Sequence, residues 1–428
     1  LQAIPDGFKH SLSAILDSNI TTLLTAIVLT WFGLGPIKGF GVVLIVGILS
    51  SLFTAILLAR LITDWWIGKG NTLTYSYPWS EKWMTNVNFD WMGKRKIAYT
   101  FSAILIAISI FSFVTRGFEL GVDFKGGHSY NIQFDKEVNL ESLRSNLDAA
   151  FGGGTIVKAV NTQNTFNITT AYNISDQSND ASDKVLAKLY DGINKYAGGS
   201  VVLDNFKKTD AQGTHIVSST KVGSTVADDI RNSSFKAGFW GLLLIFLFLL
   251  LRFRRWQFSL GAVIALAHDV CITLGAFSLL HGLVPFSLEI DQAIIACILT
   301  VIGYSTNDTV IVYDRIREYL GQYVGMDKMA VFNKAINNTL SRTIITSGTV
   351  VGVALILFLF GGTAIKSFAF GMLLGVGFGT YSSIYIASAL VVDLTKEKSL
   401  SVAKAVKETV SKAASAVSTT TTKKAPVK

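Results

Sequence analysis

Asp308 lies within the apolar segment 291–313, directly after Asn307. A charged side chain at the centre of a membrane-spanning helix costs about 2.5–3.5 kcal/mol on insertion scales, so its presence needs a reason. At helical spacing Asp308 shares a face with Thr300 and Tyr304, which predicts that it faces other helices and not lipid. Such a carboxyl group can switch between neutral and ionised states, as proton coupling requires. The alternative is an aspartate that only hydrogen-bonds a neighbouring helix.

Arg342, at the beginning of the apolar segment 342–361, is the candidate counter-charge for Asp308. If the guanidinium approaches the carboxyl group, the pair favours the ionised acid, and separation favours proton uptake. The alternative is an arginine that only holds its charge at the cytoplasmic surface.

His268 and Asp269 are adjacent in the middle of the apolar segment 259–281. One acid beside one group that titrates near neutrality could extend a proton pathway. Alternatively, His268 is a hydrogen-bond partner in helix packing.

The composition excludes an ordinary soluble enzyme. Of the 428 residues 50% are hydrophobic and 16% are charged, whereas soluble domains carry about 25% charged residues. The net charge of +9 is typical of membrane topology signals, and without an aromatic-basic module we expect no nucleic-acid partner.

The motifs give no candidate site for a cofactor. There is no phosphate-binding loop, nucleophile elbow or HExxH sequence, so we expect neither an ATP site nor an enzyme. Cys271 and Cys297 lie in apolar segments without metal-ligand spacing, so we expect no metal.

Apolar windows predict about eight membrane-spanning helices in a polytopic α-helical membrane protein. They are 12–33, 38–62, 96–115, 235–252, 259–281, 291–313, 342–361 and 366–392. An even number places both ends of the chain on one side. Lys and Arg gather in the connections after the second, fourth and sixth spans and are absent from the short alternate connections, so both ends are expected to be cytoplasmic.

Residues 116–234 form one long connection on the opposite, periplasmic side, where we expect a folded α+β domain. Hydrophobic periodicity predicts the order β-α-β-β-α-β, which is the ferredoxin-like arrangement. The expected strands are 130–134, 155–160, 165–172 and 214–220, and the expected helices are 139–151 and 181–198.

The sequence 121-GVDFKGG-127 precedes the first strand and contains Asp123, Gly126 and Gly127. Paired glycines permit a tight turn with positive φ. The sequence lacks the Lys-Ser of a phosphate loop, so we predict a structural turn.

An internal repeat is visible when the sequence is shifted by 328 positions. The first two spans then align with the last two without a gap, and both contain Phe-Gly followed by Ile-Lys-x-Phe, at 32–40 and 360–368. Both copies cross the membrane in the same direction, which predicts a parallel repeat about an axis along the membrane normal.

Four motifs, in this order, resemble a known family. They are 121-GVDFKGG-127, 267-AHDVCITLG-275, 299-LTVIGYSTNDTVIVYDRIRE-318 and 339-TLSRTIITS-347. Residues from about 89 to 393 resemble a complete SecF, and 16–56 resembles the last two spans of SecD. The whole is similar to fused SecDF, of the resistance-nodulation-division superfamily, without the earlier SecD segments.

The resemblance divides the chain into six parts. They are a SecD-like pair of spans at 1–65, a cytoplasmic connection at 66–95, the first SecF-like span at 96–115, the periplasmic domain at 116–234, five SecF-like spans at 235–393, and a basic disordered cytoplasmic tail at 394–428.

The resemblance also implies the function: a subunit of bacterial Sec protein export in the inner (plasma) membrane, driven by the proton motive force. It places functional weight on Asp308 and Arg342. The implied partners are the SecYEG translocon, the missing N-terminal SecD portion, the unfolded preprotein and the lipid bilayer. Protons are the expected coupling ion, and sodium remains an alternative, because Asp, Asn and Thr oxygens suit both.

Two other functions remain open. A proton-driven exporter of small amphiphiles would need a larger outer domain with an apolar pocket. A passive membrane scaffold would use the buried acids only to join helices.

Overall fold

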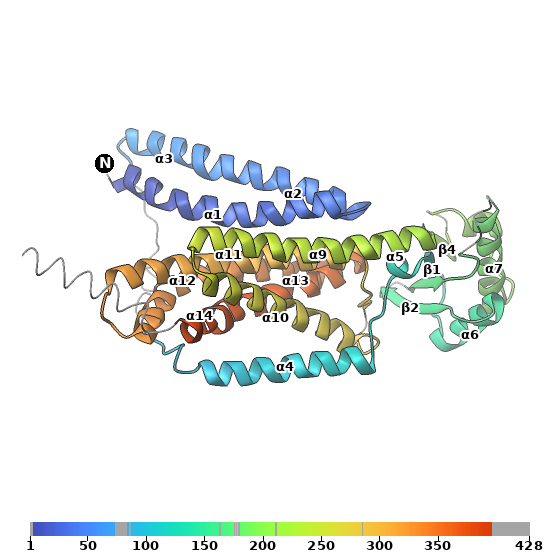
Figure 1. Ribbon diagram of the computed structural model, residues 1–428. Helices are drawn as coiled ribbons and strands as arrows, with labels where there is room; N and C mark the ends of the chain where they lie inside the picture. The colour runs from blue at the N-terminus through green and yellow to red at the C-terminus, as the bar shows by residue number, and fades with distance from the viewer. Residues whose placement is uncertain are drawn as a thin grey trace, which may run out of the picture.

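The chain folds into a bundle of long helices with a small α+β domain at one end (Figure 1). A computed structural model describes residues 3–72, 84, 87–161, 164–174, 176, 178, 180–209, 212–284 and 286–395. The predicted tail at 394–428 lies outside the described residues from 396 onward, as does part of the connection at 66–95.

The bundle contains long helices and two short π-helical segments. They are α1 (Ala3–Phe32), α2 (Pro36–Phe53), η1 (Thr54–Leu58), α3 (Ala59–Gly68), α4 (Arg95–Thr115), α9 (Ser224–Phe253), α10 (Trp256–Leu280), α11 (Gln292–Gln322), α12 (Lys328–Phe360), α13 (Thr363–Ser382), η2 (Ser383–Ala387) and α14 (Ser388–Leu394).

Among the described residues, seven helices are long and apolar enough to cross a membrane. The eighth predicted span, 12–33, coincides with the second part of α1 and includes residues whose side chains lie outside the description. The helix α1 packs along the bundle, against α2, α9 and α11.

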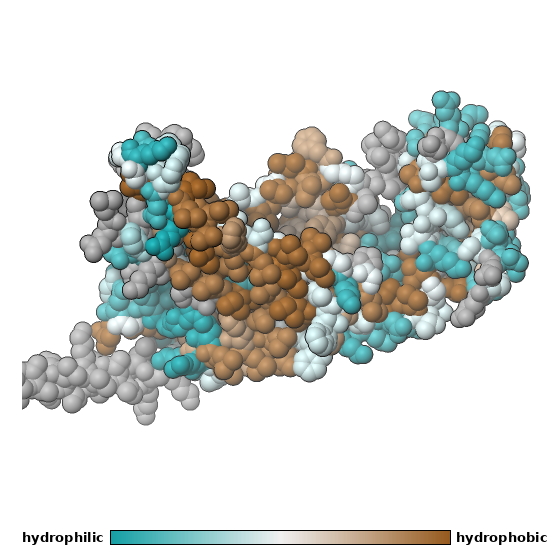
Figure 2. Space-filling model, turned by 90° about the horizontal axis from the view of Figure 1, so that it is seen from above, coloured by the Kyte–Doolittle hydropathy of each residue, from teal (hydrophilic) through white to brown (hydrophobic). Residues whose placement is uncertain are grey.

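On the face in Figure 2, apolar side chains gather over the middle of the bundle, and hydrophilic side chains are more frequent toward its end and on the α+β domain. On α2, Val43, Val46 and Leu49 are exposed. In contrast α11 is central, because it packs against α1, α10, α12 and α13 and most of its residues are buried. The polar residues of α11 are therefore held away from lipid.

The predicted repeat is present in the structure. Phe32 ends α1 and Phe360 ends α12, 328 positions later. Each is followed by a glycine, Gly33 or Gly361, where a Cβ atom would lie 2.2 Å from a carbonyl oxygen of the preceding helix. Each copy continues into a helix interrupted by a π-helical segment, η1 or η2. The two copies thus share their helix ends and their irregularities.

The α+β domain has the predicted element order. Its elements are α5 (Val122–Lys125), β1 (Gly127–Gln133), α6 (Leu140–Phe151), β2 (Ile156–Asn161), β3 (Thr165–Thr170), α7 (Ala181–Tyr196), α8 (Leu203–Phe206) and β4 (His215–Val222). The strands form one antiparallel sheet in the order β2-β3-β1-β4, which is the ferredoxin-like arrangement.

The domain has its own hydrophobic core, separate from that of the bundle. Ile132 and Ile168 of the sheet are fully buried against Leu143 and Leu147 of α6 and Leu189 of α7. Asn139 caps the N-terminus of α6, because its side chain accepts a hydrogen bond from the backbone N–H of Ser142. The domain is thus packed as an independent unit.

Candidate proton-coupling site

Asp308 lies near the middle of α11 and is fully buried. Its Oδ2 accepts a hydrogen bond of 2.8 Å from Ser347 Oγ of α12. Within the described residues, Oδ1 has no hydrogen-bond partner. A carboxyl group held by one neutral donor can gain or lose a proton with little rearrangement, whereas a fully paired carboxylate resists this change.

Three other buried polar atoms lie on α11 or on the facing helix α12. In the part of the chain that the structure describes, none of them has a hydrogen-bond partner. They are Tyr304 Oη, Asn307 Oδ1 and Thr343 Oγ1. Buried polar groups of native proteins are nearly all hydrogen-bonded, so such a group of exceptions indicates a functional site. This supports the predicted polar face of α11.

The structure does not bring Arg342 into contact with Asp308. Arg342 is exposed on α12, five residues before Ser347, and no ion pair or hydrogen bond joins its side chain to Asp308 among the described residues. The ion pair between Asp308 and Arg342 that the sequence suggested is therefore not formed in this structure.

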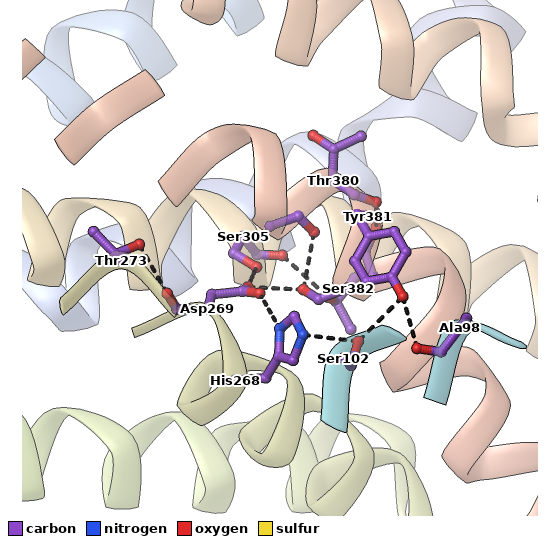
Figure 3. A network of polar contacts seen from close by, with 12 residues as sticks. Ala98, Ser102, His268, Asp269, Thr273, Ser305, Thr380, Tyr381 and Ser382 are labelled. Carbon is purple, nitrogen blue, oxygen red and sulfur yellow. Dashed lines mark hydrogen bonds and ion pairs between the residues drawn. The ribbon is translucent and has the colours of Figure 1, made fainter. Parts of the chain in front are cut away.

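His268 and Asp269 of α10 form a second buried polar centre (Figure 3). His268 Nδ1 lies 2.9 Å from Asp269 Oδ1. Asp269 Oδ2 accepts hydrogen bonds from Ser305 of α11 at 2.8 Å and from Ser382 of α13 at 2.7 Å. The carboxyl group thus joins three helices.

This second centre continues beyond His268 (Figure 3). His268 Nε2 lies 3.0 Å from Ser102 Oγ of α4, and Ser102 Oγ lies 3.1 Å from Tyr381 Oη of α13. Tyr381 Oη also donates to the carbonyl oxygen of Ala98 at 3.0 Å. Both predicted members of the pair therefore belong to a longer hydrogen-bonded chain.

The glycine motif forms the predicted turn with positive φ. Gly126 has φ of +71° and Gly127 has φ of +136°. A Cβ atom on Gly127 would lie 2.7 Å from the carbonyl oxygen of Thr170 on the adjacent strand β3. Asp123 Oδ2 accepts a 3.1 Å hydrogen bond from the backbone N–H of Gln292. The motif thus binds the first residue of α11, which carries Asp308.

A lysine that sequence reasoning did not single out also connects the domain to the bundle. Lys158 Nζ of β2 lies 2.6 Å from Glu119 Oε1 and 2.5 Å from Glu289 Oε1. Glu119 follows α4 and Glu289 precedes α11, so one cation joins both connections. The backbone reinforces this junction, since Leu120 and Ile290 form a parallel bridge.

The serines and tyrosine in these contacts were also not predicted. Ser102, Ser305, Ser347, Ser382 and Tyr381 are ordinary residues of membrane helices, and their local sequence does not show which buried group each one contacts. Their roles depend on which helices are neighbours.

No group of three or more His, Cys, Asp or Glu side chains in the described residues is arranged to hold a metal ion. Cys271 and Cys297 are free thiols.

The long apolar helices, the repeated helix pair and the buried carboxyl groups define a multi-pass membrane protein. Residues 201–397 match the family model for protein export membrane protein SecD/SecF, C-terminal, and residues 111–138 match the SecD/SecF GG motif. The chain belongs to the SecD/SecF family.

Named relatives agree with this assignment. The chain is 43% identical to protein translocase subunit SecF of Rhodothermus marinus over 309 residues, which are 72% of this chain and 94% of that protein. It is 33% identical to protein translocase subunit SecDF of Thermus thermophilus over 391 residues, which are 91% of this chain and 49% of that protein.

A solved structure has the same fold. The crystal structure of SecDF from Thermus thermophilus, a translocon-associated membrane protein, matches with a TM-score of 0.77 and 31% identity, covering 92% of this chain and 50% of that one. The chain therefore spans nearly all of a SecF relative and about half the length of the SecDF relatives.

Proposed function

We propose that this chain is a proton-coupled subunit of the Sec protein-export machinery in the bacterial inner membrane. The observation that carries the proposal is Asp308, a fully buried carboxyl group on the central helix with one neutral hydrogen-bond donor and one unpaired oxygen. The names of the SecF and SecDF relatives support the process that it serves.

The contacts of α11 offer a route from proton transfer to movement. Asp308 lies in this helix, and its first residue, Gln292, is bound by Asp123 of the α+β domain. A shift of α11 on protonation would therefore move the domain. One charge that crosses 100 mV yields about 2.3 kcal/mol, comparable with coupling energies of about 1–3 kcal/mol between sites.

The proposed orientation places the α+β domain in the periplasm and both ends of the chain in the cytoplasm, following the basic connections. There the domain could act on an emerging unfolded preprotein at the SecYEG channel. The remaining SecD portion would complete the assembly. Protons are the proposed coupling ion; sodium is the competing ion, and the dependence of activity on each gradient separates them.

Two cavities lie where the domain meets the bundle: one of about 510 Å³ has apolar side chains in its lining, among them Ile156, Val284 and Phe286, and the other is less compatible with export of small amphiphiles. This cavity of about 330 Å³ is lined by acidic and other polar side chains, among them Asp123, Glu289, Asp291, Asn131 and Asn167. Pockets for small apolar ligands are lined mainly by hydrophobic and aromatic side chains.

Two matched substitutions test the role of Asp308. In Asp308→Asn the amide oxygen still accepts the hydrogen bond from Ser347, but the residue cannot exchange a proton. In Ser347→Ala the hydrogen bond is lost, but the carboxyl group remains. Proton coupling predicts that Asp308→Asn abolishes gradient-dependent export by membrane vesicles, and that Ser347→Ala retains a large part of it.

A passive scaffold predicts the opposite order, because only Ser347→Ala breaks the contact between helices. Normal gradient-dependent export by Asp308→Asn, at unchanged protein level, would therefore overturn the proposal.

A further inference from the structure

The hydrogen-bonded chain that starts at Asp269 leaves the centre of the bundle in one direction. Asp269 lies midway along α10, Ser102 lies in the second turn of α4, and Ala98 lies in its first turn. The chain Asp269, His268, Ser102, Tyr381 therefore runs from the middle of the bundle toward the end where α4 begins. In the proposed orientation this end is cytoplasmic.

The polar side chains of the other half of α4 do not extend this chain. Ser109 donates to the carbonyl oxygen of Leu105 in its own helix. Ser112 pairs with Ser278, which donates to the carbonyl oxygen of Gly117. In the described residues these hydroxyl groups have local partners, so the contacts of His268 lead only one way.

We propose that Asp269, His268, Ser102 and Tyr381 form a proton-release path to the cytoplasmic side, distinct from the Asp308 site. The inference rests on the proposed proton coupling and adds the residues that would carry the proton out. Asp308 contacts α12 through Ser347, whereas Asp269 contacts α11, α13 and, through His268, α4.

The transfer balances at each step. The Asp269 carboxylic acid gives its proton to His268 Nδ1, and the imidazole gives the proton on Nε2 to Ser102 Oγ. Ser102 passes its own hydroxyl proton to Tyr381 Oη, which releases one to water. Asp269 ends as a carboxylate, and the ring, the serine and the tyrosine each return to neutral, with the imidazole in its other tautomer. Exchange of the tautomer resets the path.

Few charged side chains lie close to this proton path. The side chains that contact Asp269 and His268 from α4, α11 and α13 are Ser102, Ser305, Ser382 and Tyr381, none of which is formally charged near neutral pH. The ring of Tyr385 in η2 packs at a tilt against the ring of Tyr381. Two ion pairs lie at the same end: Arg95 of α4 with Asp393 of α14 at 3.0 Å, and Arg252 of α9 with Asp314 of α11 at 3.1 Å.

The end of the path lies beneath the connection that precedes α4. Tyr381 packs on Tyr385 with ring centroids 5.3 Å apart, and Tyr385 packs on Trp91 at 5.4 Å. Trp91 Nε1 donates a 2.8 Å hydrogen bond to Asn337 of α12. The aromatic rings therefore pack against one part of Tyr381, which stays partly exposed.

Infrared difference spectroscopy of the purified protein tests the first step. In the Asp308→Asn background, a carboxylic acid band that titrates with pH should be present and should disappear on adding Asp269→Asn. His268→Gln should keep this band but shift its pH midpoint, which a purely structural histidine would not do. If Asp269→Asn removes no titrating band, the proposal is wrong.

Proton flux into proteoliposomes tests the later steps. Ser102→Ala and Tyr381→Phe should slow flux about tenfold, as expected for loss of about 1.4 kcal/mol of transition-state stabilisation. Ser109→Ala is the matched control, because Ser109 lies buried on the same helix but outside the path, and its flux should be unchanged. Equal flux in Ser102→Ala and Ser109→Ala would overturn the path.

These outcomes separate the two proposals. If Asp308→Asn abolishes export while Ser102→Ala leaves flux normal, only the release path fails. If Asp308→Asn exports normally, the proposed function fails first.

Discussion

Asp123 and Gln292 are 169 positions apart in sequence, and the carboxylate of the first accepts a hydrogen bond from the backbone N–H of the second. Asp291, the residue before Gln292, caps the same helix by accepting from the N–H of Ile294. Backbone N–H groups at the start of a helix have no partner within the helix, and anionic side chains there are favoured. Thus the glycine motif of the domain is bound to the helix that carries Asp308.

Substitution of Asp123 should weaken this link. Asp123→Ala removes the acceptor, whereas Asp123→Asn keeps an oxygen that can accept from Gln292. A hydrogen bond to a charged group contributes about 1.5–3 kcal/mol. We expect Asp123→Ala to reduce gradient-dependent export strongly and Asp123→Asn to retain most of it, at equal protein levels in membrane vesicles. Equal export by the two variants would show that the hydrogen bond does not couple the domain to α11.

The Lys158 contact predicts a charge-dependent junction. Lys158→Met leaves Glu119 and Glu289 facing each other in a partly buried site, and their repulsion should lower the thermal unfolding temperature of the detergent-solubilised protein. Because the site is only partly buried, the loss in free energy of unfolding should be smaller than the about 3–5 kcal/mol that is lost when a fully buried ion pair is broken.

Adding Glu289→Gln to Lys158→Met removes one of the two negative charges. The double variant should therefore unfold at a higher temperature than Lys158→Met alone. If the second substitution lowers the unfolding temperature further, repulsion between the carboxylates is not the cause.

Local signals were sufficient to predict much of the fold. The order of strands and helices in the domain follows from hydrophobic alternation and from the Asn139 cap, both of which act within a few residues. The repeat could be detected because Phe-Gly and Ile-Lys-x-Phe recur at fixed spacing.

Contacts between distant elements could not be predicted in the same way. Asp308 and Asp269 stood out because buried acids are rare in apolar segments, but their partners Ser347, Ser305 and Ser382 come from neighbouring helices. Membrane helices contain many serines, so spacing alone does not select these three. Whether Arg342 reaches Asp308 likewise depends on how α11 and α12 pack, and among the described residues no ion pair or hydrogen bond joins the two side chains.

The α+β domain should fold alone. Residues 116–234 contain a complete four-stranded sheet whose core is separate from that of the bundle, and at about 120 residues the fragment is large enough for a stable core. We expect a soluble fragment with a single cooperative thermal transition by circular dichroism. A broad, non-cooperative melt would contradict this.

Gly127 should be the least replaceable residue of the glycine motif. Its φ of +136° is strained for other residues, and a Cβ atom would lie 2.7 Å from the Thr170 carbonyl oxygen. Backbone strain of this kind costs about 1–3 kcal/mol, and the close contact adds to it. Gly198→Ala is the control, since Gly198 has φ of +68° and open space around it. Denaturant unfolding of the fragment should show a clearly larger loss for Gly127→Ala than for Gly198→Ala.

His128 should make the stability of the domain depend on pH. The side chain is 2% exposed, its Nε2 has no partner in the described residues, and it lies opposite Lys221 in the register of β1 with β4. Burial, with a smaller contribution from the charge of Lys221, lowers the pKa of His128 below its usual value of 6.5. The folded domain therefore holds this ring neutral at a pH where the unfolded chain is already protonated.

The sign of the effect follows from proton binding. Below about pH 6.5 the unfolded state takes up a proton that the folded state does not, so stability is fully present above this pH and is lost as the pH falls. One such proton gives a slope of at most about 1.4 kcal/mol per pH unit. Replacing His128 with Phe removes this contribution while keeping an aromatic ring beside Tyr130, and the other titratable groups are common to both proteins. Denaturant unfolding of the fragment between pH 8 and pH 5 should therefore show a smaller loss of stability for His128→Phe than for the wild type, and parallel curves would exclude His128 as the cause.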